Sequence, residues 1–141
     1  RATRPDVHLF GNACPLFVPL LENGFIQPDN PITTQVAQLY LRPMIENQVD
    51  TLILGWTHYP LIYEIIDRVL NYQVTLIDPG LQVARQAQAY LTAQGMLCDS
   101  DSPGESAFYV TDTTESVAEI ASLFLGQDVQ GNVTQIDIDS L

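Results

Sequence analysis

Short apolar runs alternate along this sequence with longer segments whose apolar residues recur at helical spacing. Two runs, residues 50–55 and 74–78, have apolar centres without alternating polar residues, which is typical of strands buried on both faces of a parallel sheet. Further strands are expected at residues 7–11, 107–112 and 132–138. Because parallel strands need a crossover connection, usually a helix, the alternation predicts an α/β fold with parallel sheets flanked by helices.

The segments between these strands carry helix signals. A short helix is expected at residues 17–21 and a longer one at residues 31–48. In the longer helix Thr33 or Thr34 is a possible N-cap, and Pro43 argues for a break or kink. The apolar positions expected to face inward from this helix are Val36, Leu39 and Tyr40.

Three further helices are expected downstream. One begins near Pro60, and the others cover residues 79–95 and 113–126, where Gly95 and Gly126 provide C-terminal stops. The inward face of the first is expected to comprise Ile62, Ile65, Ile66, Val69 and Leu70. That of the second is expected to comprise Val83, Ala87, Tyr90 and Leu91.

Charge and composition exclude several classes of function. The formal net charge is −12, from five basic and seventeen acidic residues, and such a surface repels nucleic acid. No apolar run reaches the roughly 18 residues that span a bilayer, and no signal peptide opens the chain, so we expect no membrane association and a cytoplasmic protein. Cys14 and Cys98 form no metal-ligand spacing with either histidine, so no metal site is expected. Arg1 is not a natural start, which indicates processing or truncation.

Polar residues follow several of the expected strands, where open α/β sheets bind ligands. Thr57 and His58 come directly after the strand that ends at Gly55, and His58 has the proton affinity needed for acid–base chemistry near neutral pH. Glu22 is the first carboxylate after the cluster at residues 11–15. Each has a plainer interpretation, because a histidine after a strand is structural in about half of cases. Cys14 is most simply a small buried apolar residue, and Glu22 alone is most simply a surface acid.

Four motifs favour a functional interpretation of these residues over a structural one: ACPLFVPLLENG, TLILGWTHYPLI, VTLIDPGLQVARQ and FYVTDTTESVAEIASLFLG. In this order and spacing they resemble the second half of bacterial glutamate racemases, over essentially the whole chain. The resemblance implies a two-lobed aspartate/glutamate racemase-like fold. Residues 1–78 would form most of the second lobe, truncated at its start, and residues 79–141 the C-terminal part of the first lobe.

The resemblance also implies a reaction. Glutamate racemases interconvert L-glutamate and D-glutamate for peptidoglycan synthesis without a cofactor, and the enzyme is a possible homo-oligomer. One thiolate removes the α-proton from one face of glutamate, and a thiol on the other face returns a proton. Lowered cysteine pKa values and donors around the substrate carboxylate must stabilise the carbanion.

Carried over by position, the second catalytic cysteine of the family falls on Trp56. Thr57 matches the threonine that contacts substrate, His58 the histidine that assists the second cysteine, and Glu22 a carboxylate proposed to assist catalysis. Cys14 lies in the ACP motif and matches neither catalytic base. Because Trp56 has no ionisable proton, and the first catalytic cysteine lies in the half of the family sequence that is absent here, we predict that this chain does not racemise glutamate alone.

Three functional hypotheses follow. The first is a glutamate racemase seen as a partial and altered chain, and the second is a non-catalytic relative that serves as a binding or interaction protein. The third is a racemase for another amino acid, against which the Thr57–His58 pair argues, because related aspartate racemases usually carry glutamate after the threonine.

Overall fold

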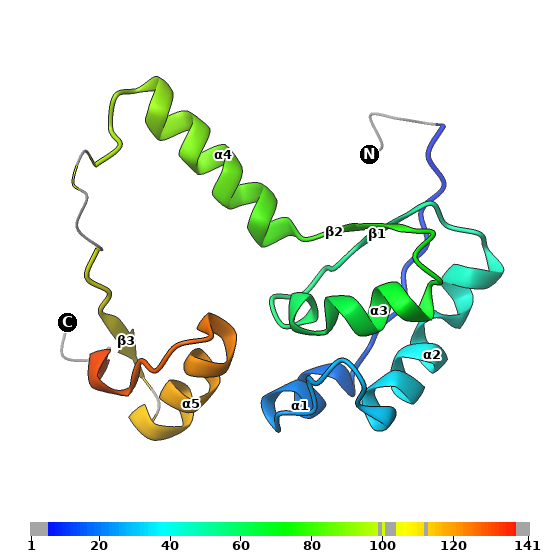
Figure 1. Cartoon of the computed structure of the whole chain (residues 1–141), viewed down its shortest axis with the longest axis horizontal. Coiled ribbons are helices and arrows are strands. Elements are labelled where there is room, and N and C mark those ends of the chain that lie inside the picture. The colour runs from blue at the N-terminus through cyan, green and yellow to red at the C-terminus, as the bar shows by residue number, and fades with distance from the viewer. Residues whose placement is uncertain (1–5, 99, 101–103, 112, 138–141) are drawn as a thin grey trace. The chain divides into compact units, whose positions relative to one another are not determined.

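The computed structural model describes residues 6–98, 100, 104–111 and 113–137. The chain forms two compact units, Arg1–Val83 and Ala84–Leu141 (Figure 1). Helix α4, Pro79–Ala93, belongs partly to each. The assignment of residues 1–78 and 79–141 to two racemase lobes stays a prediction.

The first unit is built on two parallel strands, β1 (Thr51–Ile53) and β2 (Thr75–Ile77), in which Thr51 lies opposite Thr75. Its helices are α1 (Phe17–Glu22), α2 (Pro31–Glu46), the 3₁₀ turn η1 (Tyr59–Ile62) and α3 (Tyr63–Val69). Figure 1 shows α1, α2 and α3 on one side of these strands. The predicted α/β class with parallel pairing is confirmed.

The core of the first unit lies between this sheet and its helices. The predicted inward face after Pro60 is confirmed, because Ile62, Ile65, Ile66 and Leu70 are buried and Val69 is partly buried. Burying each such aliphatic side chain stabilises the fold by about 1.5–3 kcal/mol. The remaining core residues are Phe17, Leu21, Ala37, Leu41, Met44 and Leu54.

The opposite face of β1 is open. The sequence predicts burial on both faces, yet Ile53 is 61% exposed while Leu54 is 2% exposed. Successive strand side chains point to opposite faces, and the described helices of this unit cover only the face of Leu54.

The strand predicted at residues 7–11 is wrong for this structure. The segment has no strand assignment, and its backbone forms no hydrogen bonds with other described residues. Val7, Leu9 and Phe10 are 49%, 83% and 48% exposed. A strand requires a hydrogen-bonding neighbour, and no described segment provides one here.

Helix α2 departs from its prediction at three points. Its N-cap is Asn30, whose Oδ1 accepts hydrogen bonds from the backbone N–H groups of Ile32 at 3.1 Å and Thr33 at 3.0 Å. The Thr34 hydroxyl instead donates to the carbonyl of Asn30 at 2.7 Å. The helix continues through Pro43 to Glu46. Leu39 is 62% exposed, so the prediction that it faces inward is wrong, whereas Val36 and Tyr40 are partly buried against the core.

The second unit contains β3 (Phe108–Val110), α5 (Thr114–Leu125), the 3₁₀ turn η2 (Gln130–Asn132) and β4 (Val133–Gln135). Strands β3 and β4 are parallel, as predicted, with Phe108 opposite Val133. Gly126 ends α5 at φ +65°, a left-handed conformation that glycine adopts without strain. Residues 112 and 138, at the ends of the predicted strands, lie outside the described residues.

Helix α4 is more exposed than its pattern predicts. No residue of the helix is buried, and Val83 and Tyr90 are 65% and 64% exposed. The inward face predicted for this helix is therefore wrong here, because within the described residues no element covers it. None of the described helices has the length and apolar character required to cross a membrane.

Candidate functional site

The site lies where β1 ends and the chain turns into η1. After Ile53 the chain passes through Leu54 and Gly55, and the backbone N–H of Tyr59 then donates to the carbonyl of Trp56 at 3.1 Å. This turn places the motif at the carboxyl end of β1, as predicted, where α/β sheets bind ligands. Trp56 is 55% exposed, so its indole is not part of the core.

Three of the predicted site residues come together at this turn. Nε2 of His58 lies 3.2 Å from Oε1 of Glu22, and Nδ1 of His58 lies 3.2 Å from the Thr57 hydroxyl. The His58 side chain is 16% exposed and that of Glu22 is 40% exposed. Glu22 is thus a partner of His58 and not an isolated surface acid.

The packing of α1 explains how Glu22 reaches a residue 36 positions away. Phe17 and Leu21 anchor the helix in the core. The Phe17 ring packs edge-on against Tyr59, with centroids 5.3 Å apart and an interplanar angle of 79°. Because Tyr59 follows His58 directly, this contact fixes α1 beside the turn and brings its last residue to the imidazole.

The three side chains form a hydrogen-bonded relay. With the proton on Nε2, His58 donates to the Glu22 carboxylate, and Nδ1 can accept from the Thr57 hydroxyl. The carboxylate holds the ring in one orientation. The arrangement can therefore hold a proton next to position 56.

Cys14 lies beside this relay without belonging to it. Its Sγ donates a long hydrogen bond to the carbonyl of Asn12 at 3.7 Å. Burial raises the pKa of the Cys14 thiol, and the hydrogen bond from Tyr59 offsets this in part. The pKa of Tyr59 is also raised, chiefly by burial and then by Cys14. Cys14 is therefore a protonated thiol at neutral pH.

Tyr59 and Asn12 are the site residues that sequence reasoning missed. The Asn12 side-chain amide donates to the carbonyl of Tyr40 at 2.8 Å, which ties the turn before α1 to α2. Tyr59 lies within the quoted motif, so its position next to His58 was the available signal. Nothing in the sequence pairs Asn12 with α2.

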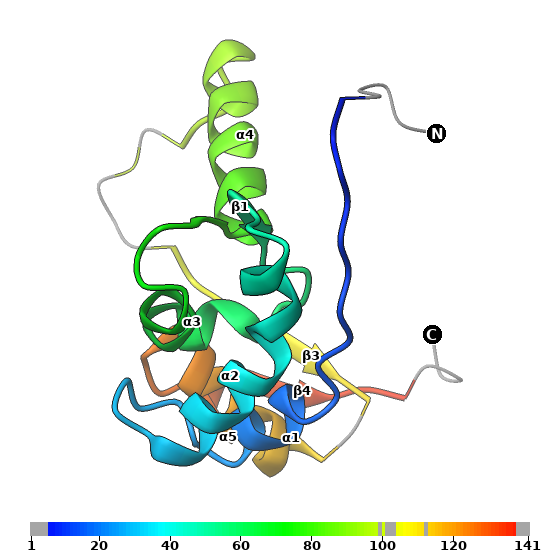
Figure 2. The same cartoon turned by 90° about the vertical axis from the view of Figure 1, so that its right-hand side faces the viewer.

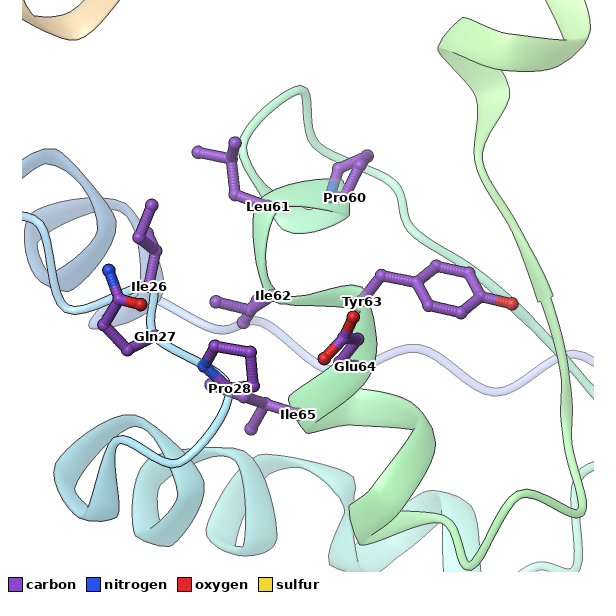
Figure 3. A pocket seen from close by; sticks show the side chains of 9 residues that line it. All are labelled: Ile26, Gln27, Pro28, Pro60, Leu61, Ile62, Tyr63, Glu64 and Ile65. Atoms are coloured by element: carbon purple, nitrogen blue, oxygen red, sulfur yellow. The ribbon is translucent and has the colours of Figure 1, made fainter. Parts of the chain in front are cut away.

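Two hollows of the first unit lie close to this turn. One, of about 230 Å³, is lined by Cys14 and Tyr59 and by residues 10–12 and 52–55. The other, of about 360 Å³, lies between residues 26–28 and 60–65 (Figure 3). None of Trp56, Thr57, His58 and Glu22 lines the second hollow, so it is separate from the relay. Across the described ranges, no three histidine, cysteine, aspartate or glutamate side chains gather as metal ligands would.

Curated proteins and solved structures resemble this chain. No family model matches it. The glutamate racemase of Chlorobaculum tepidum is 38% identical over 129 residues, which are 92% of this chain and 47% of that protein. The glutamate racemase of Syntrophus aciditrophicus is 37% identical over 90% of this chain and 46% of its own length.

The structural neighbours are of the same kind. The crystal structure of Francisella tularensis glutamate racemase in complex with D-glutamate matches with a TM-score of 0.82 and 34% identity, over 97% of this chain and 50% of that chain. The Thermus thermophilus enzyme in complex with β-chloro-D-alanine matches with a TM-score of 0.80 and 35% identity. This chain spans about half the length of the relatives that it matches. It belongs to the glutamate racemase family and corresponds to the carboxyl-terminal half of its members.

Proposed function

We propose that this chain is the carboxyl-terminal portion of a glutamate racemase that interconverts L-glutamate and D-glutamate for peptidoglycan synthesis in the cytoplasm. The observation that carries the proposal is the relay of Glu22, His58 and Thr57 at the end of β1. Family membership and the D-glutamate bound to the Francisella tularensis relative also support the proposal. The reaction proposed is proton transfer at Cα by two bases, without a cofactor.

In this proposal Thr57 and His58 bind the substrate. The Thr57 hydroxyl is 3.2 Å from Nδ1 of His58, and when Nδ1 carries a proton and donates to this oxygen, the hydroxyl proton can be donated to a substrate carboxylate. Glu22 positions His58 through the 3.2 Å contact to Nε2. These groups supply hydrogen bonds to the negative charge that develops on the substrate when its α-proton leaves.

Trp56 takes the place of the second base in this arrangement. An indole neither accepts nor returns a proton at neutral pH, and Cys14 is held protonated beside Tyr59. The 141 residues contain no other thiol except the exposed Cys98. The chain by itself therefore binds glutamate without racemising it.

The second candidate is a non-catalytic racemase-like binding protein. The same residue favours it, since Trp56 removes the base while the relay beside it stays intact. The two candidates differ in whether any thiol pair ever acts on the substrate, and they share the prediction of glutamate binding at His58.

The test is NMR observation of the two imidazoles during titration with D-glutamate. His58 should shift in a saturable manner, whereas exposed His8 serves as an internal control and should not. L-aspartate is the specificity control and should give a smaller shift. Equal responses of both histidines, or no response up to concentrations of about 10 mM, would overturn the proposal, because such weak binding corresponds to less than about 3 kcal/mol.

A further inference from the structure

Three aromatic rings connect helices α1 and α2 to the turn that carries His58. The Phe17 ring packs edge-on against Tyr40 and Tyr59, with centroids 5.3 Å from each and interplanar angles of 89° and 79°. Edge-to-face packing is a favoured geometry of aromatic pairs, because the positive edge of one ring meets the negative face of the other. Figures 1 and 2 both show α1 beside α2, as the Phe17–Tyr40 pair requires. Phe17, Tyr40 and Tyr59 form the aromatic cluster.

Hydrogen bonds fix the two outer rings of the aromatic cluster. The Tyr40 hydroxyl accepts from the backbone N–H of Leu16 at 3.2 Å, directly before α1. The Tyr59 hydroxyl donates to the Cys14 thiol, and the carbonyl of Cys14 accepts from the N–H of Phe17 at 3.1 Å. Both tyrosines are therefore tied to the start of α1 by their hydroxyl groups as well as by ring packing.

The aromatic cluster holds the main chains of both partners of the Glu22–His58 contact. Phe17 begins α1, and Glu22 is its last residue. Tyr59 follows His58 directly, and the N–H of Leu61 donates to the carbonyl of His58 at 3.1 Å. Glu22 is 40% exposed at its side chain, and a pair that water reaches gains little energy by itself. The 3.2 Å separation of Oε1 and Nε2 therefore depends on where packing places the two main chains.

We propose that the aromatic cluster positions His58 for ligand binding, with Phe17 and Tyr59 as positioning residues that act through the Glu22–His58 contact. With Nε2 directed at Glu22, Nδ1 of His58 lies at the Thr57 hydroxyl, the group that donates to the ligand carboxylate in the proposed function. Loss of either ring should let the imidazole turn away from Glu22 and misdirect that hydroxyl. The inference rests on the proposed function, because His58 needs this orientation only to serve a ligand.

NMR of the 141-residue chain without ligand tests the positioning. The readout is the nuclear Overhauser signal between the His58 ring protons and the Glu22 side-chain protons, which weakens steeply with distance. Phe17→Leu and Tyr59→Leu should each reduce this signal by about half or more, because both variants lose an edge-to-face contact. Tyr59→Phe keeps the ring and should retain the signal of the parent. Absence of the signal in the parent, or an unchanged signal in both leucine variants, would overturn the proposal.

A core variant away from the rings separates positioning from stability. Leu70→Ala removes a buried side chain at the end of α3 and destabilises the same unit, yet it should keep the His58–Glu22 signal. All variants are compared at a temperature at which circular dichroism shows each of them folded. If Phe17→Leu does not fold, Tyr59→Leu provides the test, because Tyr59 is only partly buried. A signal that falls equally in Leu70→Ala would show a general loss of packing, and the proposal would be wrong.

Titration with D-glutamate separates failure of this inference from failure of the proposed function. Tyr59→Leu should bind about fivefold more weakly than the parent or worse, whereas Tyr59→Phe should bind as the parent does, because a preorganised site loses less on binding. If the parent gives no saturable shift of His58, the proposed function fails, while the ligand-free signal still tests the positioning. If the parent and Tyr59→Leu bind D-glutamate equally well, the positioning is wrong and the proposed function stands.

Discussion

In the proposal, Trp56 decides how the chemistry of this chain differs from that of its glutamate racemase relatives. The three neighbouring side chains that support proton transfer in the proposal are in contact, with two 3.2 Å contacts that join Glu22, His58 and Thr57. The indole at position 56 is 55% exposed and therefore occupies the turn without disturbing the core. A side chain that neither donates nor accepts the α-proton stands where the family resemblance implies a thiol.

Trp56→Cys alone should not give turnover in the 141-residue chain. The change supplies one thiol, yet two bases are needed on opposite faces of Cα, and Cys14 is held protonated beside Tyr59. Chiral chromatography of L-glutamate incubated with the variant measures this directly. Formation of D-glutamate above the buffer blank would contradict the two-base account.

Cys14 and Cys98 should differ in reactivity toward iodoacetamide. Burial raises the pKa of Cys14, so its thiolate fraction at pH 8 is reduced, whereas Cys98 is exposed. We expect alkylation of Cys14 to be at least about fivefold slower at pH 8 and to accelerate as pH rises toward the raised pKa. Mass spectrometry of the time course measures both rates, with Cys98→Ser as the control. Equal rates at pH 8 would show that the Cys14 thiol is not shielded.

At the scale of elements, the strands and helices with strong local signals were predictable. The inward face of α3, the parallel pairing and the glycine stop of α5 all follow from local residues. The strand at residues 7–11 and the inward face of α4 were predicted wrongly, because an apolar pattern indicates that a segment needs a packing partner but not whether one is present. Within the described residues that partner is absent, and Leu9 and Val83 stay exposed.

The candidate site likewise has a part that local sequence predicts and a part that depends on packing between distant residues. The turn that carries Thr57 and His58 was predictable, because both residues follow an apolar strand that ends in glycine. Their contact with Glu22 depends on packing between α1 and Tyr59, which no local pattern encodes. The N-cap of α2 was misassigned for a related reason. Thr33 and Thr34 are as suitable as Asn30 in isolation, and the position of Pro31 at the first helical residue decides among them.

Asn30→Ala should destabilise the first unit by about 1 kcal/mol, because Oδ1 of Asn30 accepts from two of the N–H groups at the start of α2. Urea denaturation followed by circular dichroism measures the loss as a lower midpoint. Asn30→Asp retains an acceptor and is the matched control, and it should stay close to the parent. An equal loss of unfolding free energy in both variants would show that the N-cap hydrogen bonds of Asn30 do not provide the stabilisation.

At the scale of the whole molecule, two units each contain a two-stranded parallel sheet with helices on it. The first has an apolar core, yet it leaves Ile53, Leu9 and the hollow beside them open to solvent. The exposed apolar residues fit a chain that spans about half the length of its relatives. Such surfaces drive association when nothing covers them.

The isolated chain should therefore be poorly soluble or oligomeric. Sedimentation velocity across a range of concentrations should show species larger than a 15.6 kDa monomer. The reason is burial of exposed apolar edges between copies, so Leu9→Lys should shift the distribution toward the monomer. A monodisperse monomer that unfolds cooperatively by calorimetry would contradict this prediction.

In the proposal, this chain retains a racemase site and lacks the reaction. The most direct measurement is proton NMR of L-glutamate incubated with the folded chain in D₂O, with the Chlorobaculum tepidum racemase as the positive control. Any thiolate that removes the α-proton would replace it with deuterium, even without inversion. We predict that the α-proton signal keeps its full intensity with this chain and decays with the control enzyme. Loss of that signal with this chain would show that it still contains a working base and would contradict the account.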